Sequence, residues 1–267
     1  MNKFTSQSIG ALILSFLLIF SVACTSGDKK EKSTAKEGKA VELTISAAAS
    51  LQDALKEIET KYKEKEPNIK LSFNFGASGA LQQQIEQGAP ADLFFSAAED
   101  KFQTLVKKGF INEKEGKNLL GNELVLVIPK DSSLTKFQDL KDEKIKKIAL
   151  GTPESVPAGK YAKASLTHEN LWNDIQNKIV FTKDVRQVLT YVETGNVDAG
   201  IVYKTDALIS DKVKIGETAA TSHEPIHYPL GVIKESKHKK EATSFYEYLQ
   251  SKDAQSIFKK YGFTVLS

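Results

Sequence analysis

The feature that constrains the fold most is an alternation of strand-like and helix-like segments that begins near Val41. Residues 41–46 alternate apolar and polar side chains as a half-buried strand does, and residues 51–62 place apolar side chains on one helical face. Residues 69–75 repeat the strand pattern, and residues 91–95 form an apolar run typical of a buried strand. This alternation is typical of βα units, so we expect an α/β fold with mixed, mainly parallel sheets flanked by helices.

A second βα series follows the aliphatic run at residues 124–128, which Pro129 ends. Its expected strands are residues 145–150, 179–181, 199–202 and 228–233, and its expected helices lie at residues 158–166, near 185–192 and between 241 and 261. Two series joined through residues 124–128 and 228–233 predict two lobes, a two-strand hinge and a ligand cleft between the lobes. The predicted lobes are residues 41–123 plus 227–267, and residues 124–226.

The first 23 residues predict an export signal. An apolar run at residues 9–20 follows Lys3 and is too short for a comfortable membrane span. Small residues then precede Cys24, which resembles a lipoprotein signal in which the cysteine is lipidated, although Ser21 stands where an aliphatic residue is usual. Plain secretion with an incidental cysteine is the alternative. Residues 24–40 are polar and lysine-rich, so we expect a flexible tether to the membrane.

Composition excludes several classes of site and partner. Cys24 is the only cysteine, so an internal disulfide or a thiolate metal site is excluded. The formal net charge of +3 over 267 residues provides no broad basic field, and we expect no nucleic-acid partner. Hydrophobic residues at 40% and charged residues at 27% are normal for a soluble globular protein.

Two serines follow predicted strands at the start of predicted helices. Ser50 follows three alanines, and its spacing to Asp53 resembles a capping box, so a simple N-cap is one interpretation. Ser78 follows Gly76 and Ala77 at a second junction. The alternative interpretation is that the small residues leave room for an anion at the helix N-termini, where unpaired N–H groups point outward. A nucleophilic Ser78 is disfavoured because the G-x-S-x-G spacing is absent.

Three more candidates lie in the second series. Ala158 follows Pro157 at a helix start with almost no side-chain cover, and Val185 follows Asp184 at another. Tyr203 follows a predicted strand and offers a phenol, although it could equally be a half-buried packing residue. Together with the two serines, these positions offer hydrogen-bond donors and no added positive charge. Such a site disfavours a protonated oxyanion, whose O–H needs an acceptor, and favours a dianion.

The chain resembles the molybdate-binding proteins of ABC importers over about residues 41–263. The segments that carry this resemblance are residues 47–51, 84–94, 156–159, 184–186, 200–203 and 257–263. The resemblance implies the type II periplasmic-binding-protein fold and no enzymatic activity. It also implies a molybdate or tungstate ligand held by Ser50, Ser78, Ala158, Val185 and Tyr203, with the metal bound only as its oxyanion and no cofactor.

The same resemblance implies an ABC permease and its ATPase as partners, a monomeric binding protein, and an extracytoplasmic location with a membrane anchor at Cys24. Two departures from the family are a barer Ser78 loop and the lysine-rich tether. The alternative ligand is another tetrahedral oxyanion such as sulfate. A ferric-iron site is disfavoured because only Tyr203 lies at a matching junction, and no pattern supports an exported hydrolase or a surface adhesin.

Overall fold

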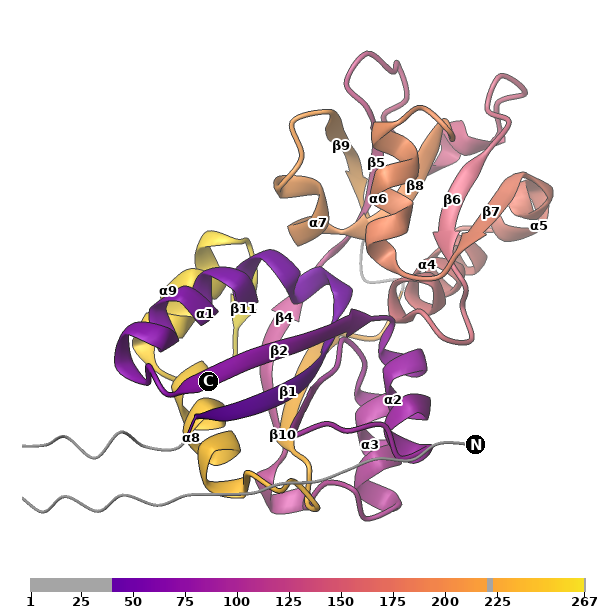
Figure 1. Ribbon diagram of the computed structural model, residues 1–267. Helices are drawn as coiled ribbons and strands as arrows, with labels where there is room; N and C mark the ends of the chain where they lie inside the picture. Colours follow the sequence, from indigo (N-terminus) through magenta and orange to yellow (C-terminus); the bar gives the residue numbers. More distant parts are fainter. Residues whose placement is uncertain (1–39, 220–222, 267) are drawn as a thin grey trace, which may run out of the picture. The chain divides into compact units, whose positions relative to one another are not determined.

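The computed structural model describes residues 40–219 and 223–266, which form two mixed sheets flanked by helices (Figure 1). The predicted signal peptide, Cys24 and almost all of the tether lie outside the described residues. Within the part that is described, no helix is both long enough and apolar enough to cross a membrane. The α/β class predicted from the sequence is confirmed.

The six-stranded sheet and its helices are called here the first lobe, and its strands lie in the order β11-β4-β10-β3-β1-β2. Helices α8 and α9 follow β10 in sequence and pack beside α1, while α2 and α3 pack against each other (Figure 1). The bounds of these elements are β1 (Val41–Ala48), η1 (Ala49–Leu51), α1 (Gln52–Lys65), β2 (Ile69–Gly76), α2 (Ser78–Glu86), β3 (Leu93–Phe95), α3 (Glu99–Lys107), η2 (Glu113–Glu115), β4 (Lys117–Asn122), β10 (Ile226–Val232), α8 (Lys239–Leu249), α9 (Lys252–Lys260) and β11 (Thr264–Val265).

The five-stranded sheet and its helices are called the second lobe, with strand order β7-β6-β8-β5-β9. Helices α4 and α6 pack on its strands β6 and β8. The bounds are β5 (Leu124–Pro129), η3 (Phe137–Lys141), β6 (Ile148–Gly151), α4 (Pro157–His168), α5 (Trp172–Ile175), η4 (Gln176–Lys178), β7 (Ile179–Thr182), α6 (Val185–Glu193), β8 (Ala199–Tyr203), α7 (Lys204–Leu208) and β9 (Val213–Thr218).

The sheets are mixed, as expected, but the expectation that they are mainly parallel is wrong. Among the described strand pairs, β1 with β2 and β3, and β6 with β7 and β8, are parallel, whereas the other five pairs are antiparallel. Three of these antiparallel pairs involve strands β4, β9 and β11, which the sequence analysis did not predict, and the other two join the predicted strands β10 with β3 and β5 with β8. Helices α2 and α3 end just before Gly88 and Gly109, which have the positive φ that favours glycine after a helix.

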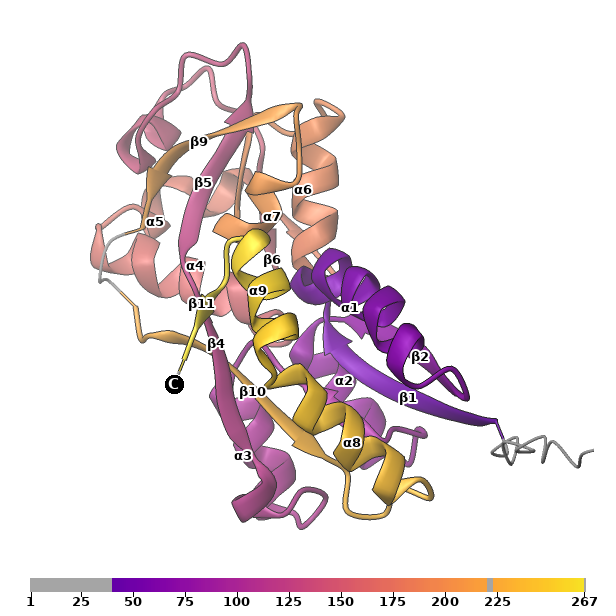
Figure 2. The same cartoon turned by 90° about the vertical axis from the view of Figure 1, so that its left-hand side faces the viewer.

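The chain passes between the two sheets twice. It leaves β4 at Asn122 and enters β5 at Leu124, and it returns between Thr218 and Ile226 (Figure 2). Strand β5 therefore belongs wholly to the second lobe, and the crossing precedes the aliphatic run at which it was expected. The predicted lobe limits, residues 41–123 plus 227–267 and residues 124–226, stay a prediction.

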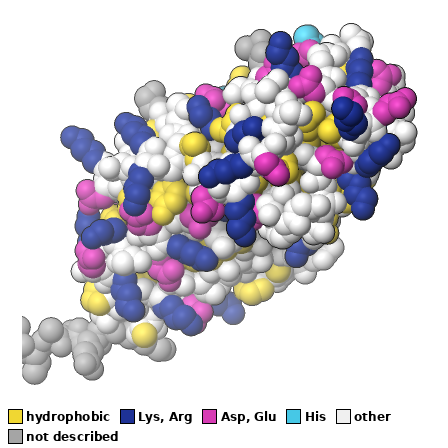
Figure 3. All heavy atoms as spheres, turned by 90° about the horizontal axis from the view of Figure 1, so that it is seen from above, with side chains coloured by type: hydrophobic (Ala, Val, Ile, Leu, Met, Phe, Trp, Pro, Cys, Tyr) yellow, Lys and Arg dark blue, Asp and Glu magenta, His cyan; other side chains and the backbone are white. Residues whose placement is uncertain are grey.

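Charged side chains of both signs are interspersed on the face of the molecule that Figure 3 presents. Lysine and arginine side chains alternate there with aspartate and glutamate side chains. Ion pairs occur among the described residues, such as Lys160 with Asp100 at 3.1 Å. This distribution agrees with the small formal net charge of the sequence. On that face, the charges do not gather into the single-sign field that steers a nucleic acid.

Candidate functional site between the two lobes

The five residues predicted to bind an oxyanion line one small cavity between the lobes. The cavity is small: its volume is about 10 Å³, close to that needed for a single water molecule and far below the roughly 300–1,000 Å³ of sites for drug-sized ligands. It is lined by Ala48, Ala49, Ser50, Gly76, Ala77, Ser78, Ala97, Val156, Pro157, Ala158, Val185 and Tyr203. These lining residues include no ionisable acid or base apart from the tyrosine. A cavity of this size and polarity suits a small ion or molecule that accepts hydrogen bonds.

Ser50 does not cap a helix, so the capping-box interpretation is wrong. It lies inside the 3₁₀ turn η1, and neither η1 nor α1 has a side-chain cap. The Ser50 hydroxyl instead lies 2.9 Å from the hydroxyl of Tyr228 on β10, and Asp53 forms an ion pair with Arg186. Because Ser50 is buried and faces the cavity, its hydroxyl is available to a bound ligand.

Ser78 is the first residue of α2, and Ala77 is its N-cap. The fully buried Ser78 hydroxyl oxygen accepts a hydrogen bond of 2.9 Å from the backbone N–H of Ala97. Ala97 itself lines the cavity and was missed by the sequence analysis. The signal that could have found it is the run of small residues after strand β3, which resembles the run before Ser50.

Ala158 lies in the first turn of α4, directly after Pro157. The next residue, Gly159, has no room for a side chain, because a Cβ at this position would lie 1.8 Å from the carbonyl oxygen of Gly151 on β6. The helix start therefore packs directly on the strand end. The N–H groups of a helix's first turn have no partners within the helix, so the N–H of Ala158 can donate to a ligand.

Val185 is the first residue of α6, and the expected acidic N-cap is confirmed. The Asp184 carboxylate accepts a hydrogen bond of 2.9 Å from the backbone N–H of Gln187. This cap bonds the N–H of Gln187 and does not use the N–H of Val185. The buried Val185 side chain lines the cavity and joins the core of the second lobe.

Tyr203 is more buried than expected, with a relative exposure of 1% instead of a half-buried position. Its hydroxyl is buried and has no hydrogen-bond partner among the described residues. Burial raises the pKa of Tyr203 well above its usual value, so the hydroxyl keeps its proton. A buried hydroxyl without a partner costs about 1–3 kcal/mol, and a ligand that accepts a hydrogen bond from it would recover this cost.

Arg186 connects the two lobes beside the cavity. Its Nη2 atom lies 2.6 Å from Asp53 on α1 of the first lobe, and its Nε atom lies 2.7 Å from Asp206 on α7 of the second lobe. Burial raises the pKa of Asp206 to about 6, although the Arg186 guanidinium acts to lower it. Because two carboxylates surround the guanidinium, Arg186 adds little net positive charge to the cleft.

Backbone groups also join the lobes at the cavity. The N–H of Gly79 on α2 donates a hydrogen bond of 3.0 Å to the carbonyl oxygen of Ser155, which precedes α4. Together with the Arg186–Asp53 pair, this bond shows that the lobes of the described chain are in contact on both sides of the cavity. The structure therefore presents the closed arrangement of the cleft.

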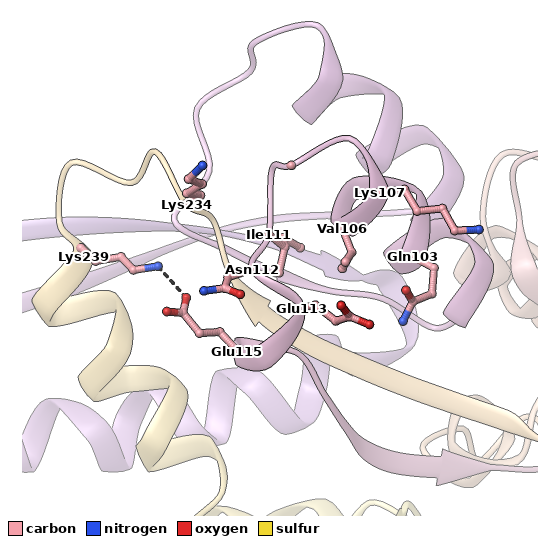
Figure 4. A pocket seen from close by; sticks show the side chains of 10 residues that line it. Gln103, Val106, Lys107, Ile111, Asn112, Glu113, Glu115, Lys234 and Lys239 are labelled. Carbon is pink, nitrogen blue, oxygen red and sulfur yellow. Dashed lines mark hydrogen bonds and ion pairs between the residues drawn. The ribbon is translucent and has the colours of Figure 1, made fainter.

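A larger hollow lies within the first lobe, away from the predicted residues (Figure 4). It is lined by Gln103, Val106, Lys107, Gly109, Ile111, Asn112, Glu113, Glu115, Lys234 and Lys239. Lys239 and Glu115 pair with each other across it at 2.8 Å. Within residues 40–219 and 223–266, no three histidine, cysteine, aspartate or glutamate side chains gather to hold a metal ion.

The comparisons with known proteins agree on one family. Residues 43–264 match the family model described as bacterial extracellular solute-binding protein. YvgL of Bacillus subtilis, named as an ABC transporter substrate-binding lipoprotein, is 57% identical over 95% of this chain and 96% of its own length. ModA of Escherichia coli, named as a molybdate-binding protein, is 38% identical over 94% of this chain and 98% of its own length.

A solved structure extends this similarity to three dimensions. It is the substrate-binding domain named for a molybdenum ABC transporter from Clostridium difficile, with a TM-score of 0.66 and 47% sequence identity. The similarity covers 85% of this chain and 100% of that chain. These relatives are named as binding proteins of transport systems, which leaves the hydrolase interpretation of Ser78 without support. The chain therefore belongs to the bacterial extracellular solute-binding protein family, and it is a substrate-binding protein of ABC transport and not an enzyme.

Proposed function

We propose that the protein captures molybdate or tungstate as a dianion in the cavity between its lobes. The observation that carries this proposal is the Tyr203 hydroxyl, which is buried at the cavity without a partner among the described residues. Its raised pKa keeps the proton in place, so the hydroxyl acts as a donor and an oxyanion supplies the acceptor.

The remaining donors come from both lobes. Ser50 and Ser78 contribute hydroxyl and backbone N–H groups from the first lobe, and Ala158 and Val185 contribute backbone N–H groups from the second. Neutral donors in a dry cleft bind a dianion without a neighbouring cationic side chain. Hydrogen phosphate is disfavoured because its O–H would find no acceptor. Sulfate is the second candidate ligand, since it carries the same charge and differs from molybdate in size.

The proposed role in the cell is delivery of the ion to an ABC permease driven by a cytoplasmic ATPase. Similarity to a named lipoprotein and to a named molybdate-binding protein supports this role. We propose that the protein acts as a monomer outside the cytoplasm, anchored through lipidated Cys24, which lies outside the described residues. Closure would bring residues 41–123 plus 227–267 against residues 124–226.

Isothermal titration of the purified protein with molybdate, tungstate, sulfate and phosphate in parallel tests the ligand. We expect tight binding of molybdate and tungstate and no measurable heat from the other two ions. Tight sulfate or phosphate binding would keep the oxyanion class and refute the ligand, whereas silence from all four ions would refute the function.

A further inference from the structure

A second tyrosine lies directly behind the ligand-facing Ser50. The hydroxyl of Tyr228 on β10 is fully buried and lies 2.9 Å from the Ser50 hydroxyl. Behind it, the Nδ2 group of Asn122 donates a hydrogen bond of 3.0 Å to the Tyr228 oxygen. Asn122 is the last residue of β4, at the point where the chain crosses to the second lobe. Sequence patterns gave no sign of either residue.

The orientation of the Asn122 amide is fixed by its other bonds. Its Oδ1 atom accepts a hydrogen bond of 2.9 Å from the backbone N–H of Glu123. Its Nδ2 group also donates a 2.9 Å bond to the Thr205 hydroxyl on α7. Exchanging the oxygen and nitrogen would place donor against donor at Glu123, so the amide presents a donor to Tyr228.

This donor sets the direction of the next bond. The Tyr228 oxygen already accepts from Asn122, and its single proton needs an acceptor in a buried place. The Ser50 oxygen supplies one at 2.9 Å. If Ser50 donated to Tyr228 instead, the tyrosine proton would lack an acceptor among these groups, which is unfavourable for a buried hydroxyl. Burial raises the pKa of Tyr228 well above its usual value, so that proton stays on the oxygen.

The same logic holds at the second serine. The backbone N–H of Ala97 donates to the Ser78 oxygen at 2.9 Å, and a backbone amide cannot reverse its direction. In both serines the oxygen therefore accepts a hydrogen bond from the side away from the cavity, and the serine's own proton is free to point into the cavity. The side chains of Tyr228 and Asn122 fix the Ser50 oxygen as an acceptor, whereas one backbone N–H group, that of Ala97, fixes the Ser78 oxygen.

We propose that Tyr228 and Asn122 are positioning residues that hold the Ser50 hydroxyl as a donor toward the cavity and thereby help to exclude protonated oxyanions. This inference rests on the proposed function and deepens it. A serine hydroxyl can ordinarily accept as well as donate, so without the relay Ser50 could accept the O–H of hydrogen phosphate. With the relay, one of the two lone pairs of the Ser50 oxygen is occupied and its proton points into the cavity, so a protonated ion meets one acceptor fewer.

The test compares wild type with Tyr228→Phe by titration with molybdate and by competition with sulfate and phosphate, each added in enough excess for an ion that gives no measurable heat to displace molybdate. The phenylalanine keeps the ring that packs edge-on against Tyr203 and Phe263, at 5.8 Å and 5.4 Å between centroids. We expect molybdate affinity to fall by up to about tenfold, the size of one lost hydrogen bond between neutral groups. We also expect the ratio of phosphate affinity to sulfate affinity at neutral pH to rise about tenfold.

Two further variants complete the design. Tyr62→Phe is the matched control, since it removes another buried tyrosine hydroxyl bonded to a serine, Ser244 at 3.3 Å, without lying at the cavity. It should keep the wild-type affinities and ratio. Asn122→Ala removes the donor that sets the direction of the relay, so it should raise the same ratio by a smaller factor, and it serves if Tyr228→Phe does not fold.

The sulfate–phosphate pair separates a relay from a structural role, because the two ions are similar in size and differ in protonation at neutral pH. A fall in all affinities by one common factor, or an unchanged ratio, would overturn the relay while leaving molybdate capture in place. Failure of the wild-type protein to bind molybdate or either competitor would overturn the proposed function and the relay with it.

Discussion

Replacing Gly79 by alanine should block closure of the cleft without harming the fold of either lobe. A Cβ at Gly79 would lie 2.7 Å from the carbonyl oxygen and 2.9 Å from the Cα of Ser155. Both atoms belong to the backbone of the second lobe, so no side-chain rotation relieves the contact. The strain disappears if the lobes separate, because Gly79 lies on α2 of the first lobe.

The magnitude follows from two terms. Separation breaks the 3.0 Å bond from the Gly79 N–H to Ser155, worth about 0.5–1.5 kcal/mol, and forced contact costs about 1–3 kcal/mol as overpacking does. Where both terms apply, the closed form loses about 1.5–4.5 kcal/mol, which weakens molybdate binding by about 10 to 2,000 times. Alanine is also a better helix former than glycine, so the ligand-free stability should not fall.

Isothermal titration with molybdate measures the affinity, and thermal unfolding without ligand measures the stability. The matched control is Gly121→Ala, whose added Cβ would meet Thr264 and Ile226 at 3.5–3.7 Å, an ordinary contact within the first lobe. A Gly79→Ala protein that binds molybdate within threefold of wild type would refute the reasoning. A fall of several degrees in its ligand-free melting temperature would show that the clash acts inside the fold instead of between the lobes.

Two further variants test the buried polar groups. Tyr203→Phe removes the hydroxyl that has no partner among the described residues. The ligand-free protein should therefore be as stable as wild type or up to about 1 kcal/mol more stable in unfolding, and titration should show molybdate affinity about tenfold lower. A loss of stability with unchanged affinity would contradict this. The raised pKa of Asp206, about 6, favours the folded state below about pH 4, and this contribution disappears as pH rises through 6. In urea denaturation, the stability of Asp206→Asn relative to wild type should therefore rise by about 2 kcal/mol from pH 4 to pH 7.5, and parallel pH profiles would count against it.

Sequence alone determined the α/β class and the order of most elements, because the spacing of apolar residues reports directly which face of a strand or helix is buried. The ends of helices α2 and α3 have a local cause, since the positive φ of Gly88 and Gly109 favours glycine. The five candidate residues also came from local signals at strand-to-helix junctions and from a family resemblance. They line one cavity in the structure, and their role as ligands stays a prediction.

Tertiary structure alone decided what each polar group contacts. Ser50 and Asp53 have the spacing of a capping box, yet they bond to Tyr228 and Arg186, which lie more than a hundred positions away in the chain. The antiparallel strands β4 and β9 and the early crossing at Asn122 depend on pairings between distant segments. A periodic pattern reports that a residue is buried but not which partner it meets, because that partner is set by how the sheets pack. The direction of the Ser50 hydroxyl, on which selectivity is proposed to depend, belongs to this second kind of information.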